Sequence, residues 1–211
     1  MKKFEKLHPT EDLDCSYEYE RVWDRYDINI RFGVYWRNRA SDLNAAAVLL
    51  GNVCEKDSPV NVSPEVLGLG SGFAFGAALP PIFRLNAGLA IELLLKACIV
   101  KRDGHCENLK PIHQLNKIAK DAGFVVTDPQ RRLLDVMTEY VYWLGRYPAP
   151  KSREQFESTR KILDGQRVKS PSGFGTVGDP EAWLNLENYQ KLWAEIMAYY
   201  ESIPARRDGD S

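Results

Sequence analysis

Apolar positions along the chain recur mainly at helical spacing. From Phe32 to about residue 51, apolar or small side chains return every three or four positions, which predicts an amphipathic helix. A strand over residues 28–34, where apolar residues alternate, is a shorter alternative that the longer pattern outweighs. From Pro81 to about Lys101 the chain is apolar on nearly every side, so we expect a central, buried helix there.

Start and stop residues predict four more helices farther along the chain. Each begins at a capping residue or a proline, the usual signals of a helix start. Their predicted ranges are Pro111 to Gly123, Thr127 to Gly145, Ser152 to Asp164, and Asp179 onward. Glycine and proline cluster in residues 56–80 and again, with serine, in residues 170–178, which predicts two loops. The longer loop is either functional or mobile.

Together these elements predict an all-α helical bundle of about five to six helices. A chain of 211 residues is near the upper size for one hydrophobic core, which favours a single bundle with additions. The predicted divisions are an N-terminal extension (1–27), the bundle (28–150), C-terminal helices that pack on the bundle (151–204) and a flexible tail (205–211).

Composition excludes several classes of protein. Hydrophobic residues at 44% and charged residues at 27% are typical of a globular domain and exclude a disordered or collagen-like chain. The chain has no apolar run long enough to span a bilayer and no secretory-type start, so we expect a cytoplasmic protein that does not bind a membrane. Its four cysteines are scattered, which indicates reduced thiols, and we expect neither a metal nor a cofactor.

Charge is unevenly distributed although the formal net charge is only −1. Residues 96–120 hold six basic and two acidic side chains, and residues 146–169 hold seven and three, so each stretch carries +4. These stretches are either solvated helix faces or part of a surface that binds nucleic acid. The glycines of residues 173–178 match G-x-G-x-x-G, but no strand precedes them, so we do not expect a dinucleotide site.

A few polar residues stand out in this apolar context. Glu92 and Lys96 are four residues apart on the central helix, either as an ion pair at a solvent-facing seam or as the lining of a groove. His113 is predicted at the start of the next helix, on the side of Lys117, where it is a surface residue or a proton acceptor.

The helix predicted to end at Gly145 carries a second polar face. Asp135, Glu139, Tyr142 and Arg146 share it, and Arg146 lies beside Trp143 and Tyr147. A guanidinium among aromatic rings is typical of a platform for phosphate and base. The alternatives are aromatic packing against another helix, or an Arg146 that pairs with Glu92 or Glu139.

Three segments together resemble the HEPN family (higher eukaryotes and prokaryotes nucleotide-binding). They are Ala87 to Ala97 with Glu92 and Lys96, the sequence His113-Gln-Leu115, and Tyr140 to Pro148 with Arg146. The resemblance implies an antiparallel helical bundle, a homodimer, and a prokaryotic role in defence or toxin–antitoxin systems. It also implies a partner protein of the nucleotidyltransferase type.

Active members of this family are metal-independent ribonucleases that use an R-x(4-6)-H motif, which this chain lacks. We therefore expect a noncatalytic module that binds RNA, a nucleotide or a partner protein, with the ligand at Lys96, His113, Lys117, Arg146 and Tyr147. One alternative is a ribonuclease with a rebuilt site of Glu92, Lys96, His113 and Arg146. Another is a helical scaffold that serves assembly alone.

Overall fold

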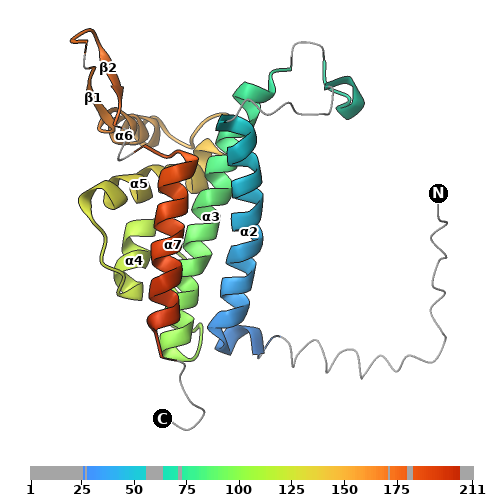
Figure 1. Ribbon diagram of the computed structural model, residues 1–211, viewed down its shortest axis with the longest axis vertical. Coiled ribbons are helices and arrows are strands. Elements are labelled where there is room, and N and C mark those ends of the chain that lie inside the picture. Colours follow the sequence, from blue (N-terminus) through green and yellow to red (C-terminus); the bar gives the residue numbers. More distant parts are fainter. Residues whose placement is uncertain are drawn as a thin grey trace, which may run out of the picture.

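The computed structural model describes residues 26, 28–55, 64–70, 73–170, 172–179 and 183–204. Most of these residues are helical, which confirms the predicted all-α bundle, and one small hairpin accompanies the helices (Figure 1). In chain order the elements are α2 (Gly33–Glu55), the 3-10 helix η1 (Pro64–Leu67), α3 (Phe75–Asp103), α4 (Leu115–Ala122), α5 (Asp128–Glu139), the π-helix η2 (Tyr140–Leu144), α6 (Arg153–Asp164), strands β1 (Arg167–Lys169) and β2 (Thr176–Gly178), and α7 (Leu186–Ser202).

The α2 and α3 helices form the long antiparallel pair of the bundle, side by side in Figure 1. The residues of α2 that are fully buried are all small: Gly33, Ala40, Ala47 and Gly51. A Cβ atom on Gly33 would lie 2.7 Å from the backbone oxygen of Ala97, closer than the two helices allow. Small side chains along this stripe therefore set the close approach of α2 to α3.

The α3 helix is the centre of the hydrophobic core, as its all-round apolar pattern predicts. Its buried residues face α2, α4, α5 and α7. From the C-terminal helix, Tyr189, Leu192 and Ile196 are buried against the same core. The α7 helix thus belongs to the core of the bundle, while the predicted division at residue 151 stays a prediction.

The α5 helix begins where the sequence predicts and continues without a break into η2. Thr127 forms a capping box with Gln130, each side chain accepting from the other residue's backbone N–H. Gly88 and Gly145 bring η2 against α3: a Cβ on Gly88 would lie 2.7 Å from Val141, and one on Gly145 2.7 Å from Leu85. These two contacts fix the position of the π-helix.

Several predicted helix boundaries are wrong. The strand alternative over residues 28–34 fails, because residues 28–31 and 33–34 are helical. The α3 helix starts at Phe75, so Pro80 and Pro81 lie inside it and the predicted loop is shorter than 56–80. Each proline lacks the N–H of an intrahelical hydrogen bond, which explains why the sequence suggested a start at Pro81. Residues 56–63 and 71–72 of that loop lie outside the described residues.

Two further helices begin later than predicted. The α4 helix starts at Leu115 and not at Pro111, because the buried Thr138 hydroxyl accepts from the Leu115 amide and supplies the cap. The α7 helix starts at Leu186, where Asn185 caps it by accepting from the amide of Asn188. Asp179, the predicted cap, instead receives a hydrogen bond from Arg132 at 3.1 Å.

The hairpin was missed because a strand of three residues is too short to show a recognisable alternation of apolar and polar side chains. Strands β1 and β2 are antiparallel, with Val168 opposite Val177, and both are exposed. Gly173 and Gly175 adopt φ of +76° in the turn between them. The G-x-G-x-x-G sequence therefore covers the end of the hairpin turn and β2. The prediction that no strand precedes it is wrong, because β1 does, but β1 and β2 pair antiparallel in a hairpin and do not form the βαβ unit of a dinucleotide site. The predicted tail (205–211) and nearly all of the predicted extension (1–27) lie outside the described residues.

Candidate functional site

Glu92 is the centre of a polar cluster in the middle of α3. It is 4% exposed, and the Nζ atom of Lys96, one turn later, donates to its Oε1 atom at 2.6 Å. The Lys96 side chain is itself only 13% exposed. The pair is therefore mostly buried, so the alternative of an ion pair at a solvent-facing seam is wrong, and the lining of a groove stays a prediction.

His113 completes the cluster from the segment between α3 and α4. Its Nδ1 atom lies 2.9 Å from Oε2 and 3.1 Å from Oε1 of Glu92. Because a carboxylate only accepts, Nδ1 carries the proton and donates it. The ring is 46% exposed, and Nε2 has no hydrogen-bond partner among the described residues. The carboxylate thus orients an imidazole whose second nitrogen is free for a ligand.

The π-helix η2 places two neighbouring aromatic residues in different surroundings. Tyr142 meets the His113 ring edge-on, with centroids 5.8 Å apart and an interplanar angle of 83°. Trp143 is buried on the α6 side, where its Nε1–H donates to Thr159 at 3.1 Å. A π-turn is a frequent feature of functional sites because it changes where side chains point.

Arg146 lies beyond the end of η2 and is exposed. Its Nη2 atom donates to the hydroxyl of Tyr147 at 3.2 Å, and its guanidinium lies 5.1 Å from the centre of that ring. In the described part of the chain it forms no ion pair. The alternative that paired it with Glu92 or Glu139 is wrong, because Lys96 and His113 bind Glu92, and Thr159 donates to Glu139.

The structure thus brings Glu92, Lys96 and His113 into one cluster, with Tyr142 in contact. Arg146 and Tyr147 form a separate pair that follows Tyr142 along the chain. Lys117 is exposed on α4 and takes part in no ion pair within the described ranges. Lys96 balances the charge of Glu92, and Lys117 and Arg146 remain as exposed cations that can meet an anion.

The remaining polar residues near this surface have structural roles. Asp135 accepts from Asn116 at 2.6 Å, and burial raises the pKa of its carboxyl. Cys98 is fully buried in α3, and burial raises the pKa of its thiol to about 12, so it stays protonated and is a poor metal ligand. Across the described residues, no three His, Cys, Asp or Glu side chains gather into a possible metal site.

Comparison with models of known protein families, with curated proteins and with solved structures found no match. Among the helices of the described part, none combines the length and apolarity needed to cross a bilayer.

Proposed function

We propose that this chain is a HEPN-like helical module that binds RNA or a nucleotide through phosphate and does not cleave it. The observation that carries the proposal is the imidazole of His113, held on one side by buried Glu92 and open at Nε2 on the other. Arg146 supplies a guanidinium with no carboxylate partner in the described ranges, and Lys117 supplies an ammonium. Guanidinium groups are well suited to bidentate contacts with phosphate.

Aromatic side chains beside His113 and beside Arg146 support a ligand that carries bases. Tyr142 contacts His113, and Tyr147 is 50% exposed beside Arg146. Base stacking on such rings is tolerant of sequence and contributes roughly 1–3 kcal/mol per base. The family resemblance adds a role in prokaryotic defence or a toxin–antitoxin pair, with a nucleotidyltransferase-type partner protein.

The Arg146→Ala variant tests the position of this surface. We expect it to bind single-stranded RNA about tenfold or more weakly, since a charged hydrogen bond to phosphate is lost, while its melting temperature stays unchanged because the side chain is exposed. Fluorescence anisotropy at two salt concentrations measures the affinity, which should fall as salt rises. Lys191→Ala removes an exposed cation from α7 and should leave affinity unchanged. Equal affinities for Arg146→Ala and wild type would refute the proposed site.

A second candidate function is favoured by the contact between Glu92 and His113. A carboxylate that orients an imidazole is the arrangement of a general base, and it supports a metal-independent ribonuclease. The family's R-x(4-6)-H motif is absent, so we expect the purified protein to leave single-stranded RNA intact in the presence of EDTA. Cleavage that disappears in His113→Ala would replace the binding proposal with this one.

We also propose that the chain is a homodimer and that the outer face of α2 forms the contact. One stripe on this face follows alternating steps of three and four residues, the spacing of a coiled-coil seam. Its members on α2 are Tyr35, Arg39, Asp42, Ala46, Leu49 and Val53, and Phe32 continues the spacing just before the helix.

The seam is complementary to itself when a second copy runs antiparallel. Pairing Arg39 of one copy with Asp42 of the other also pairs Phe32 with Leu49 and Tyr35 with Ala46. The apolar members are unusually accessible for a monomer: Leu49 is 69% exposed and Phe32 46%. A two-fold axis midway between Arg39 and Asp42 therefore brings opposite charges together and places apolar side chains of one copy against those of the other.

Leu49→Glu is expected to convert the dimer to a monomer, because it places a charge in both layers that pair Phe32 with Leu49. Light scattering at micromolar concentration measures the mass. Val125→Glu changes a residue that is 89% exposed between α4 and α5, and this control should stay dimeric. A monomeric wild-type protein would contradict the proposal.

A further inference from the structure

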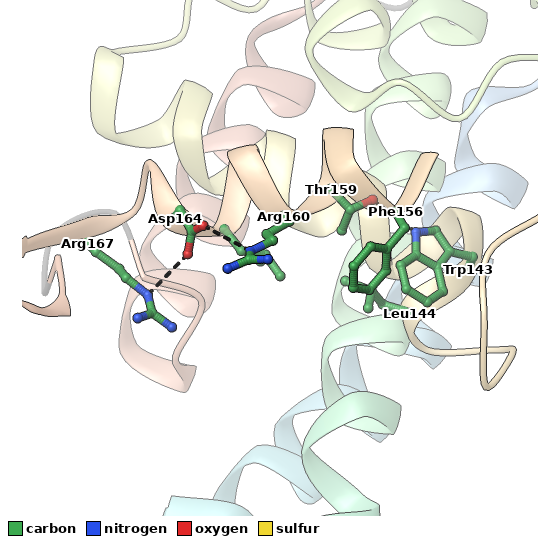
Figure 2. A pocket seen from close by; sticks show the side chains of 8 residues that line it. Trp143, Leu144, Phe156, Thr159, Arg160, Asp164 and Arg167 are labelled. Carbon is green, nitrogen blue, oxygen red and sulfur yellow. Dashed lines mark hydrogen bonds and ion pairs between the residues drawn. The ribbon is translucent and has the colours of Figure 1, made fainter. Parts of the chain in front are cut away.

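A pocket of about 290 Å³ lies between η2, α6 and β1, on the α6 side of the π-helix. Figure 2 shows aromatic side chains at one end and two arginines at the other. Its lining residues include Trp143, Phe156, Thr159, Arg160, Asp164 and Arg167. None of the residues proposed to bind RNA or a nucleotide around His113 and Arg146 lines it.

The aromatic end of the pocket is held in place by buried hydrogen bonds. Trp143 is 7% exposed and donates from Nε1 to Thr159, which is 2% exposed and in turn donates to Glu139. Phe156 stands beside the indole in Figure 2 and is 49% exposed, although it lies on an otherwise polar helix. This end offers a flat apolar surface that is partly exposed to solvent.

The other end of the pocket carries more positive than negative charge. Arg160 and Arg167 share the carboxylate of Asp164, with N–O distances of 3.6 and 3.5 Å. Both distances exceed the roughly 2.7–2.9 Å of a strong charged hydrogen bond, and both guanidiniums are largely exposed. Asp164 therefore holds the two arginines on one side of the pocket while leaving each with N–H groups for an anion.

We propose that this pocket binds a single nucleotide, with its base against Phe156 and Trp143 and its phosphate at Arg160 and Arg167. The volume is at the lower end of small-molecule sites, which suits a single nucleotide unit. A free mononucleotide and the phosphorylated end of an RNA strand share this chemistry. The site is separate from the surface around His113.

Calorimetry with AMP, adenosine and inorganic phosphate tests the pocket. AMP should bind at least about tenfold more tightly than adenosine or phosphate alone, since it engages both ends of the pocket. Arg160→Gln and Phe156→Ala should each lower the AMP affinity about tenfold or more. Both side chains are exposed, so neither change should alter the melting temperature.

A matched control lies on the same helix. Arg153 is 88% exposed, pairs with Glu157 and does not line the pocket, so Arg153→Gln should bind AMP as the wild type does. Adenosine that binds as tightly as AMP, or an Arg160→Gln variant with unchanged affinity, would overturn the proposal. The Arg146→Ala variant should bind AMP in this pocket as the wild type does. The pocket proposal and the proposed RNA surface can therefore fail independently of each other.

The source of the nucleotide follows from one comparison. If a short RNA with a 5′ phosphate binds more tightly than AMP, and Phe156→Ala abolishes that binding, the pocket is assigned to the end of a strand. If AMP binds more tightly than the RNA, and Phe156→Ala abolishes that binding, the pocket is assigned to a free nucleotide.

Discussion

Glu92→Ala is expected to lower the free energy of unfolding by about 3 kcal/mol. The change removes the acceptor of Lys96 and leaves an ammonium that is mostly buried without a partner. It also frees the ring of His113, because both carboxylate oxygens lie within 3.1 Å of Nδ1. Urea denaturation monitored by circular dichroism measures the loss.

The chain offers a matched exposed pair as the control. Glu187 and Lys191 have the same spacing on α7, with Nζ and Oε1 2.8 Å apart, but both are solvent-exposed. Glu187→Ala should therefore leave the stability almost unchanged. Replacing Glu92 and Lys96 together with methionine should recover most of the loss, because no charge is then left buried. Similar losses for Glu92→Ala and Glu187→Ala would contradict the buried-pair account.

Gly88→Ala is expected to destabilise the protein by about 2 kcal/mol, although alanine favours helix formation. The new Cβ would lie 2.7 Å from Cγ2 of Val141 and 3.2 Å from the backbone oxygen of Met137. Val141 is buried and β-branched, so it has little freedom to move. The π-helix would have to shift away from α3, and Tyr142 would move with it.

Gly76→Ala is the control in the same helix, and it should not lower the stability of the protein. Its Cβ would meet no atom within 4 Å, so this variant should be as stable as the wild type or slightly more stable. Thermal melting of both variants checks the pair of predictions. A Gly88→Ala protein as stable as Gly76→Ala would show that the close approach of η2 and α3 is unimportant.

Local signals in the sequence predicted two helix starts whose caps lie in the adjoining residues, although the equally local cap of α7, Asn185, was missed. Thr127 and Ser152 both cap the helices that follow them. The start of α4 was missed because its cap, Thr138, is 23 residues away along the chain and approaches only in the folded bundle. A distant partner of this kind leaves no trace in local sequence.

The candidate site was predictable in part. Helical spacing alone predicted that Glu92 and Lys96 pair, but it did not predict their burial or the contact with His113. That contact depends on how the chain reverses between α3 and α4, where Gly104 adopts φ of +77°.

Arg146 does not join the cluster, although an uninterrupted α-helix would place it on one face with Glu139 and Tyr142. The π-turn changes the rotation per residue, and the helix ends at Leu144. The pocket between η2 and α6 was missed because it depends on the unpredicted strand that carries Arg167. The one sequence signal for it was the +4 charge of residues 146–169.

Hydrogen exchange in the presence of a single-stranded RNA oligomer tests the central claim most directly. If the surface around His113 and Arg146 binds RNA or a nucleotide, amides in residues 113–117 and 142–147 should exchange more slowly with the oligomer or with ATP, and the RNA should be recovered at full length. Protection that is absent from both segments with either ligand, or RNA that is recovered shortened, would contradict the account.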